Sequence, residues 1–169
     1  MTAPTAPLHN ATACKASRHE RVQHLITADE TALAELAALI ATLPICSTGR
    51  VFIEVPDESW ISPVEVPARM VVTWLARSCR TGAPGSGRSC APGQALARAV
   101  TAWADEMLCA VGSDGASGGH DASCAGGTRI HLLGGYLGTA DIFDHLVGDL
   151  HVAPDTVHTP ARFGLSATA

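Results

Sequence analysis

The segment His24–Leu43 constrains the fold of this chain more than any other part of the sequence. It begins as an apolar run, passes through a polar turn that includes Thr27, Asp29 and Glu30, and continues as an alanine- and leucine-rich stretch. The first part predicts a short buried strand, and the second predicts a helix that Pro44 ends, because apolar residues recur there at spacings of three and four. A strand that feeds a helix through a short polar turn begins a β-α-β unit. The strand residues are Val22, Leu25 and Ile26, and the apolar helix face consists of Leu33, Leu36, Ala37, Ile40 and Leu43.

The polar turn contains two side chains suited to cap this helix. Thr31 lies just before Ala32, and Asp29 is the competing residue; either can accept a hydrogen bond from a free backbone N–H group. The N-terminus of a helix can also bind a phosphate. The turn lacks the GxGxxG pattern, so the sequence leaves open both an ordinary capped turn and a nucleotide site.

Four further strands and two further helices follow along the chain. The strands at 51–55 and 70–76 are nearly continuous apolar runs, which are typical of parallel strands buried on both faces. Between them we expect an irregular crossover that Trp60 anchors to the core, since the segment holds two prolines and no helical period. The alternation of elements predicts an α/β fold, a doubly wound and mostly parallel five-stranded sheet with helices on both faces. The other predicted elements are strands at 129–133 and 156–158, a helix at 94–110, and a helix from Thr139 or Asp141 to about 150.

Composition excludes several classes of function. The 169 residues suffice for one domain with a buried core. A formal net charge of −5 argues against nucleic acid as a partner. No apolar run approaches the roughly 20 residues that span a bilayer, and the N-terminus has no secretory apolar region. We therefore expect no membrane association and a cytoplasmic location.

The six cysteines are scattered without a CxxC pair, so we expect free thiols and no metal site. The string GASGG at 115–119 matches GxSxG but lies in a glycine-rich segment rather than between a strand and a helix. The nearby His120, Asp121 and Cys124 have no second cluster to complete a metal site. His131 and His145 are expected to be structural or surface histidines.

Two tails and two loops within the domain are predicted to be irregular. Residues 1–18 are expected to form a disordered tail, and 161–169 a C-terminal tail. Glycine- and serine-rich composition predicts flexible loops at 78–93 and 112–127.

Glu54 is a carboxylate inside an apolar strand, which is costly unless the group has a partner. We expect it to lie near the carboxyl edge of the sheet and to pair with Arg77 or a backbone amide. An internal anchor is favoured over a ligand contact.

Four segments together resemble the C-terminal domain of the siderophore-interacting protein family, which is related to the ferredoxin–NADP reductase superfamily. The resemblance implies a Rossmann-like domain over residues 19–160 with strand order 3-2-1-4-5. In that family this domain binds NAD(P)H and presents it to a flavin held by an N-terminal β-barrel, which we expect this chain to lack. The four segments are Asp29–Leu33, Phe52–Asp57, Val72–Arg77 and Leu132–Gly135.

The resemblance also implies roles for individual residues, with NADP or NAD as the cofactor. The turn from Thr27 to Thr31, with Asp29 and Glu30, would face the pyrophosphate. Arg77 would lie at the adenosine ribose or its 2′-phosphate. The turn from Gly134 and Gly135 to Gly138 would let the backbone approach the nicotinamide. No residue of the chain is expected to be catalytic, and no bound flavin or metal is expected.

Two departures from the family pattern keep a second hypothesis open. Gly135 stands where the family usually has a glutamate, and the segment 139–150 holds aspartates but no arginine or lysine. The first hypothesis is a stand-alone nucleotide-binding module that works with a separate flavin protein in iron- and siderophore-linked redox chemistry. The alternative is a non-catalytic accessory or interaction protein that kept the fold and lost the cofactor.

Overall fold

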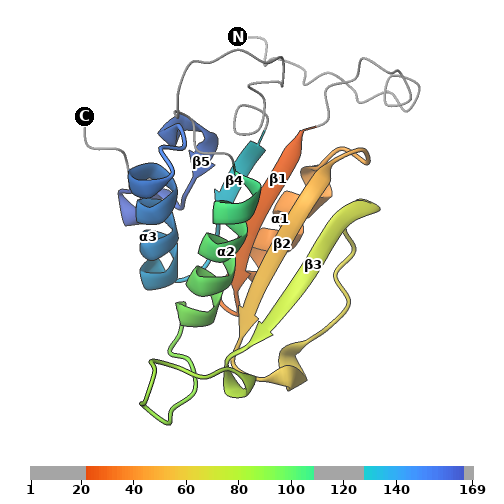
Figure 1. Ribbon diagram of the computed structural model, residues 1–169. Helices are drawn as coiled ribbons and strands as arrows, with labels where there is room; N and C mark the ends of the chain where they lie inside the picture. The colour runs from red at the N-terminus through yellow and green to blue at the C-terminus, as the bar shows by residue number, and fades with distance from the viewer. Residues whose placement is uncertain (1–21, 109–127, 166–169) are drawn as a thin grey trace.

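A five-stranded parallel sheet forms the centre of the molecule. The computed structural model describes residues 22–108 and 128–165. The strands lie in the order β3-β2-β1-β4-β5, and each neighbouring pair is parallel (Figure 1). This confirms the predicted α/β class and strand order. The strands are β1 (Gln23–Asp29), β2 (Thr48–Val55), β3 (Arg69–Ala76), β4 (Thr128–Leu132) and β5 (Val157–His158).

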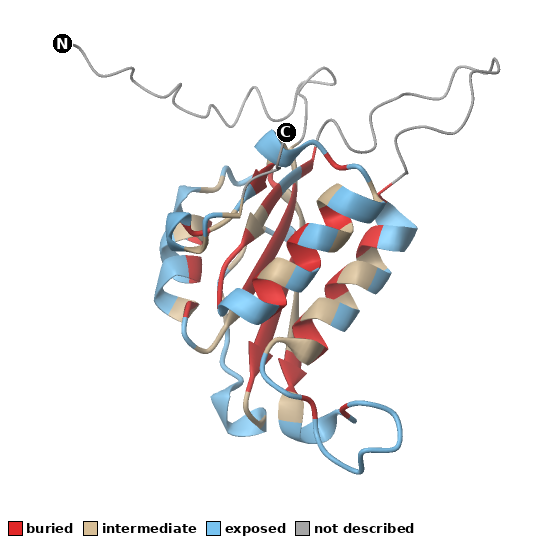
Figure 2. Ribbon diagram, turned by 90° about the vertical axis from the view of Figure 1, so that its left-hand side faces the viewer, coloured by how far each residue is buried: buried red, intermediate tan, exposed pale blue. Residues whose placement is uncertain are grey.

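Helices cover both faces of the sheet, as predicted. The helix α1 (Leu33–Thr42) packs on one face, while α2 (Gln94–Met107) and α3 (Tyr136–Asp144) pack on the other. Figure 2 shows the buried strands between helices whose buried residues face the sheet. Successive strand residues point to opposite faces, so β1, β2 and β3 contribute to both cores. The core on the α2 side includes Leu25, Phe52 and Ile130, and the core on the α1 side includes Ile26, Val51 and Ile53.

The two strands predicted to be buried on both faces, β2 and β3, differ in their burial. Residues Val51–Val55 of β2 are all buried, because β2 lies inside the sheet. β3 is an edge strand, and the side chain of Val71 is 52% exposed. Burial on both faces was therefore the wrong prediction for β3. Trp60 is also largely exposed, so it does not anchor the crossover to the core.

Two element boundaries differ from the sequence prediction. β1 extends to Asp29, so Thr27 belongs to the strand rather than to the polar turn. α3 begins at Tyr136, ahead of the predicted Thr139 or Asp141, and Gly135 is its N-cap residue. Gly138 consequently lies inside the helix and is buried. The helix continues as a π-helical turn, η4 (His145–Asp149).

Short 3₁₀ turns fill most of the remaining described connections, including one within the predicted C-terminal tail. The predicted tail 1–18 and the predicted loop 112–127 lie outside the described residues. Within the described part of the chain, no helix is both long and apolar enough to cross a membrane. The turns are η2 (Glu58–Trp60), η3 (Arg77–Cys79), η5 (Pro154–Thr156) and η6 (Ala161–Phe163).

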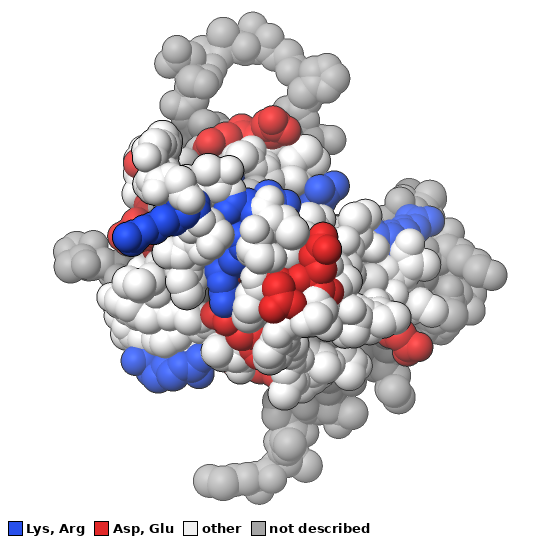
Figure 3. Space-filling view, turned by 90° about the horizontal axis from the view of Figure 1, so that it is seen from below, with Lys and Arg blue, Asp and Glu red and all other residues white. Residues whose placement is uncertain are grey.

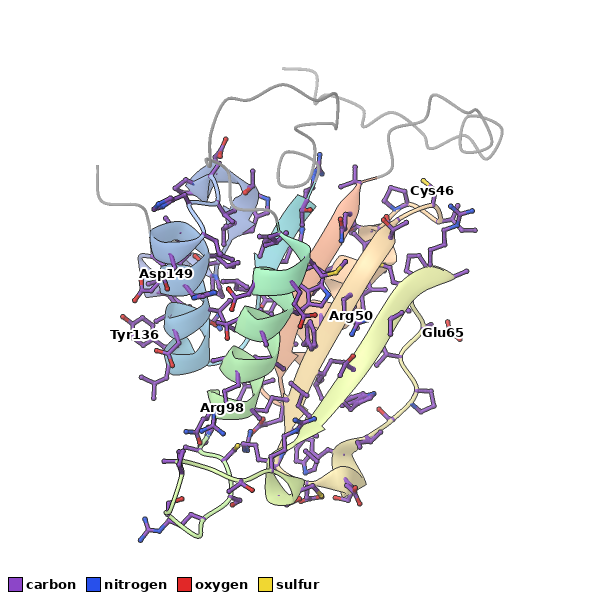
Figure 4. All side chains as sticks on the ribbon, viewed as in Figure 1. Cys46, Arg50, Glu65, Arg98, Tyr136 and Asp149 are labelled. Carbon is purple, nitrogen blue, oxygen red and sulfur yellow. The ribbon has the colours of Figure 1, made fainter. Side chains whose placement is uncertain are left out.

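The segment 78–93 contains its own hydrogen bonds. Thr81 and Ser89 form an isolated antiparallel bridge, and the N–H of Gly82 donates to the carbonyl of Arg88 at 2.8 Å. The Arg98 guanidinium, on α2, donates to the carbonyls of Thr81 at 2.8 Å and Gly82 at 3.1 Å. Figure 4 shows Arg98 near the beginning of α2, beside this segment.

Candidate functional site

The candidate site lies at the carboxyl ends of β1 and β4, where α1 and α3 begin. The N–H of Leu133 donates to the carbonyl of Thr27 at 3.0 Å, and the Thr27 hydroxyl donates to the carbonyl of Leu133 at 3.4 Å. The turns that follow the two strands are therefore held side by side. Ligands of doubly wound sheets bind at such a junction, outside the carboxyl ends of the strands.

The Asp29 carboxylate joins the two turns. Its Oδ1 accepts hydrogen bonds from the N–H of Thr31 at 2.9 Å and from the Thr31 hydroxyl at 2.5 Å. Its Oδ2 accepts from the N–H of Gly135 at 2.6 Å. Gly134 has a φ of +117°, and a Cβ there would lie 3.0 Å from the carboxylate carbon of Asp29. The close approach and the positive φ both require glycine at this position.

The predicted cap of α1 was wrong. Ala32 is the N-cap residue, and no side chain of the described residues caps the helix. Asp29 lies too early in the chain to do so, because β1 extends to this residue and its carboxylate closes the turn onto Thr31 instead. The first N–H groups of α1 therefore have no side-chain acceptor, and α3 also begins without a side-chain cap.

Arg77 is held by two carboxylates. Its guanidinium makes a two-pronged contact with Glu30, at 2.7 Å and 2.9 Å, and donates to Glu54 at 3.1 Å. The hydrogen bond from Arg77 holds the pKa of Glu30 below its ordinary value, and the same bond raises the pKa of Arg77. The residue expected at the ribose or 2′-phosphate is therefore already paired within the protein.

Glu54 is an internal anchor, as its position in an apolar strand predicted. Its side chain is fully buried, and it contacts both kinds of expected partner. Besides Arg77, it accepts hydrogen bonds from the N–H groups of Gly93 and Leu96, each at 2.7 Å. Because these groups belong to the beginning of α2, the carboxylate stabilises the N-terminus of that helix.

Around the site, the backbone favours an anion and the side chains oppose one. The uncapped N-termini of α1 and α3 present N–H groups that suit a diphosphate. Three carboxylates, those of Asp29, Glu30 and Glu54, lie there with the single guanidinium of Arg77. Figure 3, seen from the side of the strand carboxyl ends, shows acidic and basic side chains lying next to each other on this face.

Further arginines lie on the segment that follows β3 and on α2. A cavity of about 320 Å³ is lined by Arg80, Arg98, Thr81 and Cys90, among others. The Cys90 thiol donates to the carbonyl of Thr81 at 3.2 Å. Sequence reasoning missed this arrangement, because composition alone assigned the segment to a loop.

The structure brings together most of the residues that the resemblance pointed to. Asp29 contacts Gly134 and Gly135 directly. Thr31 bonds to Asp29, and Thr27 bonds to Leu133, the residue before Gly134. Glu30 and Arg77 form a pair beside them, whereas Gly138 lies inside α3, packed against Gly93. The bond from Gly135 to Asp29 had no signal in the sequence, since it depends on how β1 and β4 are paired. Among the described residues, no three side chains are placed to hold a metal ion together.

These features define a doubly wound α/β protein in which the strand order reverses between β1 and β4, the position at which such sheets bind ligands. A family model described as siderophore-interacting protein matches residues 22–110, more than half of the 169 residues. The chain belongs to the siderophore-interacting protein family. No curated protein matches it.

Solved structures with the same fold include two from bacterial siderophore systems. The siderophore-interacting protein SipS from Aeromonas hydrophila is 18% identical with a TM-score of 0.53, and the match covers 83% of this chain and 50% of that one. A siderophore utilization protein from T. fusca is 22% identical with a TM-score of 0.52, and the match covers 83% of this chain and 44% of that one. The chain thus matches about half the length of these proteins.

Proposed function

We propose that the crevice between the turn after β1 and the turn after β4 binds a nicotinamide dinucleotide, NADP or NAD. The observation that carries this proposal is the meeting of two helix N-termini, without side-chain caps, at one edge of the sheet. Such N-termini attract a diphosphate through their free N–H groups and helix dipoles. The glycines at 134 and 135 let the Asp29 carboxylate lie against the backbone of the second turn, which keeps the two turns close together.

We further propose that the chain takes part in siderophore-linked redox chemistry, together with a flavin held by a separate protein or domain. Membership of the siderophore-interacting protein family supports this proposal. The dinucleotide would supply hydride, and the residues of this chain would bind and orient it. We expect this activity in the cytoplasm, where reduced dinucleotides are held.

A charge variant at the start of α1 tests the proposal. Ala34 is exposed in the first turn, so Ala34→Asp adds a carboxylate that suits the helix but repels a diphosphate. The matched control is Ala38→Asp, which adds the same charge to an exposed position one turn later. Calorimetric titration with NADPH and NADH should show binding to the wild type and the control, and much weaker binding to Ala34→Asp. Absence of heat with the wild type up to millimolar ligand would overturn the proposal.

The second candidate is an accessory protein that kept the fold and lost the cofactor. It is favoured by the internal pairing at the site, where Arg77 contacts two carboxylates and Asp29 accepts from Gly135. If the chain has this function, neither dinucleotide should change its melting temperature. A pull-down from cells should then recover a specific protein partner. A clear rise in melting temperature with NADPH would contradict it.

A further inference from the structure

The two edges of the sheet differ in how well they are protected. β5 has two residues and lies between Pro154 and Pro160, so it offers little backbone for pairing with another strand. β3, on the opposite side of the sheet in Figure 1, has eight residues. From Met70 to Ala76 it contains no charged residue, proline or glycine. Natural proteins usually protect a long edge strand with charges or prolines, and β3 has neither along this run.

The outer backbone of β3 has few partners among the described residues. The strand pairs with β2 over its whole length. Apart from that ladder, its one backbone hydrogen bond within the described part of the chain is donated by the N–H of Met70 to the carbonyl of Pro67, at 2.8 Å. Because N–H groups alternate between the two sides of a strand, those of Val72 and Trp74 point to the same open side as that of Met70. Such an edge is a template for pairing with another extended chain.

The crossover that precedes β3 lies toward one face of the sheet rather than on this edge. Its residues from Pro63 to Pro67 line a cavity of about 500 Å³ together with residues of α1. Val64 and Val66 pack against the core on that side. On the other face of β3, the side chain of Val71 is exposed. A second strand can therefore reach the edge from solvent.

The side chains of β3 suit pairing with a second copy of the same strand. Val72 and Trp74 pack against the core on the α1 side, and Leu75 belongs to the core on the α2 side. A two-fold axis normal to the sheet makes two such strands antiparallel and sets each face beside the same face of the other copy. Apolar side chains then lie opposite apolar side chains on both faces, which stabilises a strand pair.

Charge determines the direction of this pairing. Arg69 is the only charged residue of β3. An antiparallel pair keeps the two Arg69 side chains at opposite ends, more than about 20 Å apart, whereas a parallel pair would place them side by side. Arg77, just beyond the other end of the strand, is already neutralised by Glu30 and Glu54.

We propose that β3 pairs antiparallel with β3 of a second copy of this chain, which joins the two five-stranded sheets into one sheet of ten strands. The free backbone N–H and carbonyl groups of each strand then bond to those of the other. Because one strand from each copy forms most of the contact, the interface belongs to the small class. We therefore expect a reversible dimer that forms at micromolar concentration.

The dimer leaves the candidate nucleotide site of each copy open. β2 separates β3 from β1, so the turns that contain Asp29 and Gly135 lie away from the paired edge. The two-fold axis turns the carboxyl ends of the strands in the two copies to opposite ends of the joined sheet. Each copy can then meet its own partner, and dimer formation does not depend on dinucleotide binding.

A matched pair of lysine variants tests the proposal in the full chain. Val71→Lys adds a charge to the edge strand, and Met107→Lys adds the same charge at the end of α2; the two side chains are 52% and 50% exposed. Analytical ultracentrifugation from low micromolar to submillimolar concentration should show a dimer for the wild type and for Met107→Lys. The dissociation constant of Val71→Lys should rise by more than about tenfold, because pairing removes water from the added charge. Circular dichroism checks that both variants fold.

Hydrogen exchange of the wild type locates the interface without any variant. The amides of Val72 and Trp74 should exchange more slowly as the dimer forms, while those of β5 should not change. A wild type that stays monomeric at submillimolar concentration would overturn the proposal, and so would equal dissociation constants for Val71→Lys and the wild type. A dimer that leaves exchange in β3 unchanged would place the contact elsewhere and also overturn it. Protection of β3 at every concentration in a monomer would mean that another segment of the same chain occupies the edge, against the proposal.

Discussion

At the scale of single residues, the Glu54 carboxylate is held by more than one kind of partner. It accepts from Arg77 and from two N–H groups of α2, and its side chain is fully buried. A buried carboxylate without such partners strongly destabilises the fold. Removal of the carboxylate is also destabilising, because its buried donors are then left unpaired. Burial of Glu54 in an apolar strand was sufficient to predict an anchor, because an unpartnered charge is too costly there.

We predict that Glu54→Ala destabilises the fold by about 3–5 kcal/mol, the range for one member of a buried ion pair. The substitution leaves the N–H groups of Gly93 and Leu96 without an acceptor and removes one of the two carboxylates that hold Arg77. Urea denaturation followed by circular dichroism measures the change. The exposed Glu58→Ala should cost less than about 0.5 kcal/mol. Similar losses for the two variants would contradict the role of Glu54.

The ion pair of Glu30 and Arg77 makes the stability of the fold depend on pH. Arg77 holds the pKa of Glu30 below its ordinary value of 4.5, so the unfolded chain takes up this proton before the folded chain does. The stability that Glu30 contributes is therefore complete above about pH 4.5 and is lost as pH falls through the lowered folded-state pKa.

We expect Glu30→Gln to be less stable than the wild type at pH 7 and the difference to shrink below about pH 4.5. Denaturation midpoints measured between pH 3 and 7 give this difference. A gap between the two proteins that stays constant across the range would show that Arg77 does not stabilise the Glu30 carboxylate.

At the scale of the elements, α3 shows clearly how tertiary packing can move a helix start away from the position that the sequence predicts. Gly134, Gly135 and Gly138 have low helical propensity, so the sequence predicts a turn there and a helix that begins at Thr139 or Asp141. The helix nevertheless begins at Tyr136, where Gly138 packs on Gly93. A Cβ on Gly138 would lie 2.8 Å from the Cα of Gly93. The contact between α2 and α3 thus requires a residue without a side chain.

We predict that Gly138→Ala destabilises the protein by about 1–3 kcal/mol, although alanine favours helices over glycine. The added methyl group meets backbone atoms of Gly93, which cannot move without separating the two helices. The control is Gly148→Ala in η4, where an added Cβ has nothing within 4 Å. Thermal unfolding should rank the control at or above the wild type, and Gly138→Ala clearly below both. An unchanged melting temperature for Gly138→Ala would contradict the close packing.

Strands and helices with strong periodicity could be predicted because their residues carry the pattern themselves. The strand β2 and the helix α1 are examples, since burial of one face or of both determines their composition. Contacts between elements could not be read in this way. The bond from Gly135 to Asp29 and the stacking of the His131 ring on that of His158 depend on the pairing of strands that are distant in the sequence. The pairing of Arg77 with Glu54 could be predicted because both residues lie at the carboxyl ends of neighbouring strands, Glu54 one residue before the end of β2 and Arg77 one residue after the end of β3.

At the scale of the whole molecule, the sheet is most protected at its centre. β1 lies between β2 and β4, and both cores include its residues. β3 and the short β5 form the two edges. Local opening is easier where fewer buried contacts must be broken.

We predict that hydrogen exchange follows this order, with hydrogen-bonded amides of Ile26–Ala28 and Val51–Ile53 the slowest and those of β5 faster. Mass spectrometry of exchanged peptides measures the rates without labels. The Glu54→Ala variant should accelerate exchange at the beginning of α2 before the centre of β1 is affected. Equal protection of β5 and β1 would indicate an assembly that covers the β5 edge.

The contacts of Glu54 with Arg77 and Gly93 bear on how far the loop between these two residues can change in length. Oε1 of Glu54 accepts a hydrogen bond from Arg77, which precedes the loop 78–92, and another from the N–H of Gly93, which follows it. The entropy of a closed loop grows slowly, by about 0.6 kcal/mol for each doubling of its length. Near its tip, Gly85 and Gly87 have open space around them. An inserted peptide tag or reporter should be accommodated there, because the base of the loop is held by the buried Glu54 side chain and by the bonds from Arg98 to Thr81 and Gly82.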